Sequence, residues 1–155
     1  MKKMFFQDKL NRIEIWGGEP SYGLKRTLPT ILKAIDYFPN LSNFFFSTNL
    51  TTTTCINDIF DFYKNIAETN LNRNFIFTIQ LSIDGPTEIN DFNRGQGTTD
   101  KFTKNFCQFV LKGKEFLNQY NNVKIEAFFK PTLDGANILS LNTKDKISNY
   151  FHFLD

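Results

Sequence analysis

The sequence predicts an α/β protein in which parallel strands alternate with helices. Short stretches with apolar residues at every second position alternate along the chain with longer stretches that have apolar residues at helical spacing. Successive strands are separated by enough chain for a helix, as parallel pairing requires. The strand predicted at residues 75–83 is also polar on one face, which indicates a curved sheet with helices outside and a polar cavity inside.

Length and composition indicate one globular domain. The chain has 155 residues, of which 41% are hydrophobic and 22% charged, and this balance excludes a disordered chain. The net charge is +2 and the basic residues are scattered, so nothing indicates binding to nucleic acid or to an anionic membrane. No apolar run approaches the ~20 residues of a membrane span, and no export signal is visible. We therefore expect a cytoplasmic protein.

The periodicity gives the order of the elements. Strands are predicted at residues 13–16, 44–49, 75–83 and 123–129. Helices are predicted at residues 27–38, 56–67, 102–117 and 144–154, and residues 1–12 are expected to contain the end of another helix. Thr27 is the expected N-cap of the first full helix, with Pro29 in its first turn. The segment from Asp84 to Gly97 is expected to be a turn followed by a polar loop.

The first strand leads into a turn made of Gly17, Gly18, Glu19 and Pro20. The two glycines can adopt positive φ and allow a ligand close to the backbone, because neither has a Cβ. Glu19 then places a carboxylate at the carboxyl end of a strand, where α/β proteins bind their ligands. The alternative is an ordinary connection between a strand and a helix, with a solvated glutamate.

Polar residues follow one face of several predicted strands. Thr78, Gln80 and Ser82 share a face, and Asp84 comes just after them. The same pattern appears in the neighbouring strands, at Ser47, Asn49, Lys124, Glu126 and Lys130. An unpaired buried polar group costs ~1–3 kcal/mol, so we expect these side chains to line a hydrated cavity. A flat sheet with one face in solvent is the alternative.

The two cysteines do not form a ligand cluster in the sequence. Cys55 and Cys107 are too far apart for a CxxC motif and both fall in predicted helices. We interpret them as small core residues.

Three strand ends together resemble a known superfamily. These are Gly17-Gly18-Glu19-Pro20, Phe46-Ser47-Thr48-Asn49, and Ser82-Ile83-Asp84-Gly85-Pro86, the last followed by Asp91 and Arg94. They are similar to motifs of the radical S-adenosylmethionine enzymes, and within these to the SPASM or anaerobic sulfatase-maturase branch, which modifies peptides and proteins. The resemblance extends from about residue 10 to about residue 135. It implies a partial parallel (β/α) barrel, with residues 1–155 forming a single incomplete core domain that contains about strands two to five.

The resemblance also implies how S-adenosylmethionine is bound. The turn containing Gly17, Gly18 and Pro20 would present Glu19 to the methionine amino group. Arg94 would bind the ligand carboxylate, since a planar guanidinium can do so with two parallel hydrogen bonds.

The resemblance also implies roles for residues that would contact the nucleoside part of the cofactor. It implies that Ser82 and Asp84 hold the ribose and that Asn49 contacts a polar edge of the cofactor. The residue before Asp91 is often histidine in such enzymes, and because Asn90 stands there we assign it no role.

The chain departs from the family at the iron–sulfur cluster. Relatives hold a [4Fe–4S] cluster with the three cysteines of a CxxxCxxC loop, and this chain has no such motif. We therefore predict no catalytic residue and no metal ligand in this chain, which alone should be inactive. It would be a fragment or one half of a split enzyme, working with a complementary chain that carries the cluster motif, on a peptide or protein substrate.

Two other functions fit the sequence. The chain is either an inactive module that binds a peptide or nucleotide and pairs with a partner chain, or an unrelated enzyme that uses Glu19, Asp84 and Asp91 as acid–base groups. The second alternative lacks a suitable base, because His152, the only histidine, is expected to pack in the last helix.

Overall fold

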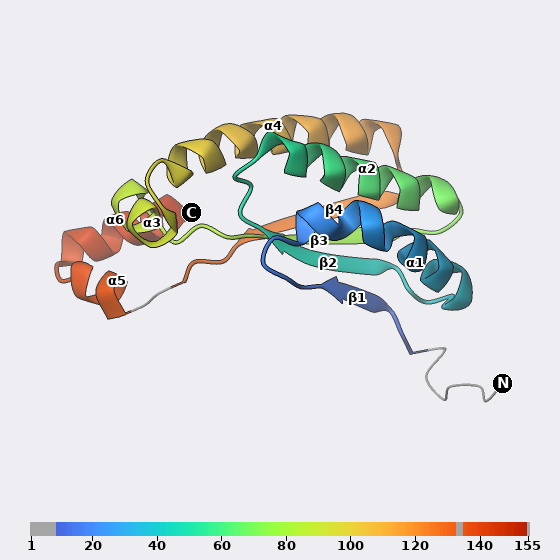
Figure 1. The fold of residues 1–155 in the computed structure, drawn as a ribbon, viewed down its shortest axis with the longest axis horizontal. Coiled ribbons are helices and arrows are strands. Elements are labelled where there is room, and N and C mark those ends of the chain that lie inside the picture. The colour runs from blue at the N-terminus through green and yellow to red at the C-terminus, as the bar shows by residue number, and fades with distance from the viewer. Residues whose placement is uncertain (1–8, 133–134, 155) are drawn as a thin grey trace.

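The computed structural model describes residues 9–132 and 135–154 and contains one parallel four-stranded sheet (Figure 1). Its strands lie in the order β1, β2, β3, β4. They comprise β1 (Arg12–Ile15), β2 (Asn43–Thr48), β3 (Phe75–Leu81) and β4 (Val123–Phe129). The predicted α/β class and all predicted strands are therefore confirmed.

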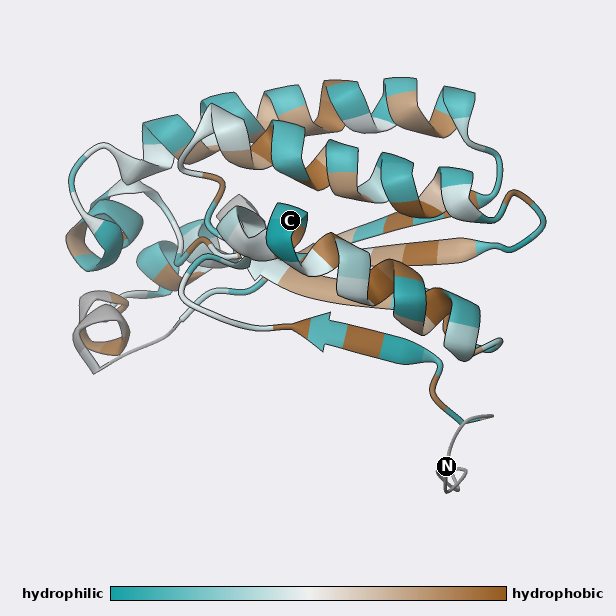
Figure 2. Ribbon diagram, turned by 45° about the vertical axis from the view of Figure 1, so that its right-hand side comes forward, coloured by the Kyte–Doolittle hydropathy of each residue, from teal (hydrophilic) through white to brown (hydrophobic). Residues whose placement is uncertain are grey.

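The helices occupy two places relative to the sheet. Three long helices, α1 (Leu24–Tyr37), α2 (Thr53–Thr69) and α4 (Thr98–Gln119), cover one face (Figure 1, Figure 2). The shorter α3 (Thr87–Arg94), α5 (Gly135–Ser140) and α6 (Lys144–Leu154) gather beyond the carboxyl ends of the strands. A 3₁₀ turn, η1 (Pro20–Gly23), links β1 to α1. Among residues 9–132 and 135–154, no helix combines the length and apolar character that crossing a bilayer requires.

An aromatic core joins the three long helices to the sheet. Phe44 and Phe77 pair in register on β2 and β3 and point toward the helices, where both are fully buried. The ring of Tyr63, from α2, stacks on Phe77 with centroids 4.0 Å apart. Such contacts explain the use of nineteen phenylalanines, since each buried ring removes a large apolar area from water.

The opposite face of the sheet carries no helix among the described residues, and aromatic rings shield part of it. Phe45 lies between Trp16 and Phe128, with ring centroids 5.1 Å and 6.3 Å away. Beside these rings, Thr78 and Gln80 are each only 7% exposed. The polar face was correctly predicted, but the helices do not enclose it, and neighbouring side chains provide its cover.

Several local predictions were wrong. The first long helix begins at Leu24 rather than at Thr27, whose hydroxyl donates to the Leu24 carbonyl, so Pro29 lies inside the helix. Pro29 is tolerated there because it is on the exposed side, where solvent reaches the carbonyl that loses its partner. The polar loop expected before α4 contains α3, and α5 was not predicted.

Two expected core positions are at the surface. Cys55 is buried as predicted, but Cys107 is exposed on α4. His152 is also exposed on α6 rather than packed. The helix expected in residues 1–12 does not extend into residues 9–11, and residues 1–8 lie outside the described part of the chain.

Replacing Tyr63 by phenylalanine should stabilise the protein. The Tyr63 hydroxyl is buried without a hydrogen-bond partner among the described residues, and burial raises its pKa. A buried hydroxyl without a hydrogen-bond partner costs ~1–3 kcal/mol. Tyr63→Phe should therefore raise the free energy of unfolding, measured by urea titration, by about 1 kcal/mol. Tyr120→Phe is the matched control, because the Tyr120 hydroxyl donates to Glu68 at 2.7 Å on the surface. A gain in the control equal to that of Tyr63→Phe would contradict the explanation.

Candidate functional site

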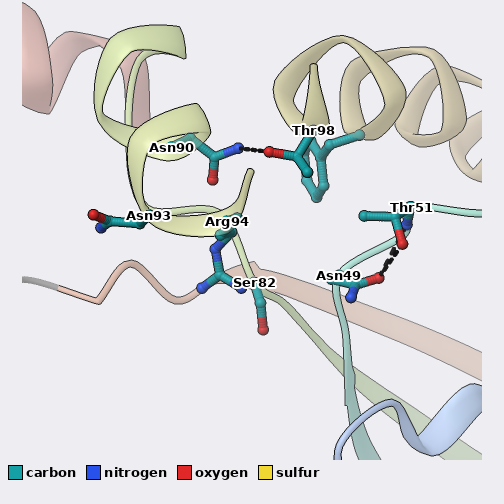
Figure 3. A pocket seen from close by; sticks show the side chains of 8 residues that line it. Asn49, Thr51, Ser82, Asn90, Asn93, Arg94 and Thr98 are labelled. Atoms are coloured by element: carbon teal, nitrogen blue, oxygen red, sulfur yellow. Dashed lines mark hydrogen bonds between the residues drawn. The ribbon is translucent and has the colours of Figure 1, made fainter. Parts of the chain in front are cut away.

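A polar pocket of about 310 Å³ lies at the carboxyl ends of β2 and β3 (Figure 3). Residues from four neighbouring segments form its wall: the loop after β2, the end of β3, α3 and the start of α4. They are Asn49, Thr51, Ser82, Asn90, Asn93, Arg94, Thr98 and Phe102. The volume is at the lower end of the range for small-molecule sites, and the position is the one at which parallel α/β sheets bind ligands.

The charged group of this wall is the guanidinium of Arg94. It is held from behind by Asp84, whose Oδ1 accepts a hydrogen bond from Arg94 Nη2 at 2.7 Å. The Asp84 side chain is 3% exposed and that of Arg94 27% exposed, so the carboxylate is the inner member of the pair. Arg94 Nε is buried and has no partner among the described residues. The guanidinium of this lining residue therefore has an N–H donor that the described chain leaves unused.

The Asp84 carboxylate has three hydrogen-bond partners in the described chain. Besides Arg94, its Oδ1 accepts the Thr132 N–H at 2.8 Å and its Oδ2 accepts Asn93 Nδ2 at 3.4 Å. Burial works to raise the pKa of the Asp84 carboxyl, but the hydrogen bonds and the charge of Arg94 outweigh it and leave that pKa below its usual value. Asp84 is therefore an ionised anchor at neutral pH, and it lies beside the pocket wall.

The loop after β2 is strained and strongly held. Leu50 has φ of 49°, the only positive φ of a non-glycine residue in the described chain. Its N–H donates to Thr48 Oγ1, and its carbonyl accepts Asn105 Nδ2 from α4. Asn49 Oδ1 accepts from both the N–H and the hydroxyl of Thr51, which leaves Asn49 Nδ2 for the pocket (Figure 3). A left-handed leucine costs ~1–2 kcal/mol, and these bonds offset that cost.

The glycine-rich turn after β1 lies outside the pocket wall. Gly17 and Gly18 are exposed, neither has positive φ, and a Cβ at either position would meet no atom within 4 Å. Pro20 is buried at the start of η1. Neither glycine is therefore required here by a strained turn or by close packing.

Glu19 connects this turn to the pocket through the backbone. Its Oε1 accepts from the N–H and the hydroxyl of Ser21, and its Oε2 accepts the Asn49 N–H at 2.9 Å. The Ser21 hydroxyl also lies 3.0 Å from Cys55 Sγ, at the start of α2. One carboxylate therefore fixes the ends of β1 and β2 relative to each other.

Asn90 organises the junction between α3 and α4. Its side chain is 1% exposed. Its Oδ1 accepts the Asp84 N–H at 3.0 Å, while its Nδ2 donates to the hydroxyls of Thr98 and Thr99. Asn90 received no role from the sequence, yet it joins the end of β3 to the first turn of α4.

Asp91 caps the start of α4. Its carboxylate accepts the N–H groups of Gly97 and Thr99 and the hydroxyls of Thr98 and Thr99. Gly97 has φ of 75°, a conformation that favours glycine. The Thr99 hydroxyl and N–H are the main cause of the pKa of Asp91 falling to about 2, with further contributions from Gly97 and Thr98.

The structure brings some of the predicted site residues together and leaves others apart. Asn49, Ser82 and Arg94 line one pocket. Asp84 and Glu19 are each one hydrogen bond away from it, through Arg94 and the Asn49 N–H. Gly17, Gly18 and Pro20 are not part of the wall. Sequence reasoning missed the other lining residues, which are Thr51, Asn90, Asn93, Thr98 and Phe102.

The residues present do not fit an iron–sulfur cluster. No three His, Cys, Asp or Glu residues of the described chain are grouped as metal ligands. Cys55 Sγ is buried against the hydroxyls of Ser21 and Thr52, and Cys107 is exposed on α4. The two thiols therefore cannot serve a site that needs several thiolates.

Comparison with known proteins identifies the fold. No protein-family model and no curated protein matches the chain. The fold resembles a solved structure of a histidine-tagged form of anSMEcpe with bound AdoMet, with a TM-score of 0.53 and 19% identity over 94% of this chain. It also resembles "Native anSMEcpe with bound AdoMet", with a TM-score of 0.53 and 18% identity over 96% of this chain.

The chain spans only about a third of those structures, 33% and 36% of their lengths. At 18–19% identity, the similarity shows a shared fold and not a shared function. The predicted fold, a partial parallel (β/α) barrel, is confirmed.

Asp91 should make stability depend on acid pH. Its folded pKa of about 2 is below the ~3.9 of an unfolded aspartate, so its stabilisation is complete above the unfolded value and is lost as the pH falls toward 2. Asp91→Asn should therefore lower the urea midpoint more at about pH 6.5 than at about pH 3. Asp36→Asn, on the exposed side of α1, is the control. An Asp91→Asn deficit of equal size at both pH values would show that the charge is not involved.

Proposed function

We propose that this chain is an S-adenosylmethionine-binding portion of a radical S-adenosylmethionine enzyme. The observation that carries the proposal is Arg94, which is fixed by Asp84 in the wall of a polar pocket and has a buried, unpartnered Nε. An arginine in this state is suited to a carboxylate, because the guanidinium donates two parallel hydrogen bonds and is already oriented. The likeness in fold to two structures with bound AdoMet supports the same ligand.

The other residues suggest how the ligand would be oriented. Ser82, in the pocket wall, has a hydroxyl suited to the ribose, and Asn49 Nδ2 is suited to a polar edge of the nucleoside. Glu19 has three of its four acceptor positions occupied by Ser21 and Asn49, and the fourth would accept the ligand ammonium. Gly17 and Gly18 leave open space beside that carboxylate.

The activity belongs to the parent enzyme. S-adenosylmethionine bound there would be cleaved reductively to modify a peptide or protein substrate, as in the SPASM-like branch. The cluster required for that chemistry would be ligated outside the described residues, by a complementary chain or segment, because the two cysteines present cannot hold it. We propose that this chain alone is inactive and that the parent enzyme is cytoplasmic.

One feature favours a second candidate function. β1 is an edge strand, and Trp16, just after it, is 60% exposed beside the uncovered face of the sheet. Such an edge is suited to pairing with an added strand. An inactive module that binds a peptide or completes the sheet of a partner chain would use this surface, with or without nucleotide binding.

Calorimetric titration with S-adenosylmethionine tests the first proposal. We expect binding in the wild type that becomes at least tenfold weaker in Arg94→Gln, since a hydrogen bond to a charged group contributes ~1.5–3 kcal/mol. Glu19→Gln should weaken binding by a similar factor because it removes the charge opposite the ammonium.

Matched controls separate binding from folding. Arg26→Gln and Glu115→Gln remove the same charges from exposed positions on α1 and α4 and should leave the affinity unchanged. Urea titration of each variant checks that the fold is retained. Absence of binding in the wild type, or equal losses in the controls, would refute the proposal, and binding of a peptide alone would favour the second candidate.

A further inference from the structure

We propose that Asp84 is a positioning residue for ligand binding, which holds Arg94 in the pocket wall and does not itself touch the nucleoside. This inference rests on the proposed function, because the ligand that distinguishes the roles is S-adenosylmethionine. It gives Asp84 a different role from the ribose contact that the sequence resemblance implies.

The geometry places Asp84 behind Arg94 rather than beside the ligand. The Asp84 side chain is 3% exposed and does not line the pocket, whereas Arg94 does. The 2.7 Å bond from Arg94 Nη2 to Asp84 Oδ1 joins the end of β3 to the last residue of α3. Because both charges are largely withdrawn from water, their attraction is screened little and the guanidinium has a preferred orientation.

Three acceptor positions of the Asp84 carboxylate are used within the protein. Oδ1 accepts Arg94 and the Thr132 N–H, and Oδ2 accepts Asn93. A ribose hydroxyl would have to displace one of these partners or reach a nearly buried carboxylate. Ser82, two residues earlier, already presents a hydroxyl in the pocket wall.

Close packing limits how far Asp84 can move toward the pocket. The next residue, Gly85, has φ of 142°, and a Cβ added there would lie 2.5 Å from the Tyr150 ring of α6. On the other side, the Asp84 N–H is held by Asn90 Oδ1 at 3.0 Å. The backbone that carries Asp84 is therefore confined by α3 and α6, which is what a fixed support for Arg94 requires.

Two ligands distinguish a positioning role from direct contact. S-adenosylmethionine has the carboxylate that Arg94 would bind, whereas 5′-methylthioadenosine retains the nucleoside and lacks the amino-acid part. Asp84→Asn should weaken binding of S-adenosylmethionine roughly tenfold and leave the affinity for 5′-methylthioadenosine unchanged. Equal losses for both ligands would mean that Asp84 contacts the nucleoside or only supports the fold, and would overturn the proposal.

A double-variant cycle tests whether Asp84 acts through Arg94. In the Arg94→Gln background, Asp84→Asn should cause no further loss of S-adenosylmethionine affinity, because the group that Asp84 orients is already absent. Additive losses would overturn the proposal. Asp84→Glu retains the charge but moves it by one methylene, and it should restore part of the affinity lost in Asp84→Asn.

A measurement without ligand keeps the two proposals separate. Phenylglyoxal modifies accessible arginines, and mass spectrometry reports each site individually. Asp84→Asn should increase the modification rate of Arg94 several-fold and leave that of exposed Arg26 unchanged. An unchanged Arg94 rate would refute the positioning role even if the wild type binds S-adenosylmethionine. Failure of the wild type to bind that ligand would refute the proposed function, and the Arg94 rate would still decide whether Asp84 orients it.

Discussion

Irregular backbone at the carboxyl ends of the strands has N–H groups that need acceptors, and three carboxylates supply them. Glu19 accepts the N–H groups of Ser21 and Asn49, and so joins β1 to β2. Asp84 accepts the Thr132 N–H and Arg94, and so joins β3, α3 and the segment after β4. Asp91 accepts the Gly97 and Thr99 N–H groups and joins α3 to α4. An unpaired buried N–H group costs free energy. These bonds therefore determine which side chains lie at the carboxyl ends of the strands.

This anchoring explains how a pocket rich in amides and hydroxyls keeps its shape. The strained loop at Leu50 is held by bonds from Thr48 and Asn105, and that fixes Asn49 and Thr51 in the wall. On the other side, Asn90 holds α3 against the first turn of α4. Each lining side chain is therefore carried by backbone that has few alternative conformations. A site of this kind loses little entropy when it orders around a ligand, and such preorganisation favours tight binding.

The sequence predicted the long helices and strands because their apolar periodicity is strong. It did not predict the short helix or the pocket residues whose positions depend on polar contacts between segments. Alternate residues of the strand from Phe75 to Leu81 point toward the helices, and the sequence shows the same alternation of apolar residues. α3 was missed because it has little apolar character, with Phe92 76% exposed, and depends on its links to Asp84 and α4. Asn90 and Thr98 could not be recognised as pocket residues, since their positions depend on bonds between segments. Arg94, Ser82 and Asn49 were found because they belong to motifs at strand ends that resemble those of a known superfamily.

The proposed binding of one amino-acid head group by both Glu19 and Arg94 depends on the bond between Glu19 and the Asn49 N–H. The backbone of Glu19 follows β1, whereas the pocket begins at β2, and neighbouring strands are ≈4.8 Å apart. The 2.9 Å bond to Asn49 carries the Glu19 carboxylate across that gap, to the end of β2. An α-amino acid has its ammonium and its carboxylate on the same carbon, so it needs its two partners close together. A glutamate directed away from Asn49 would leave the ammonium of a ligand held by Arg94 without a counter-charge. The same contact that joins two strands therefore directs the Glu19 carboxylate toward Asn49, which lines the pocket together with Arg94.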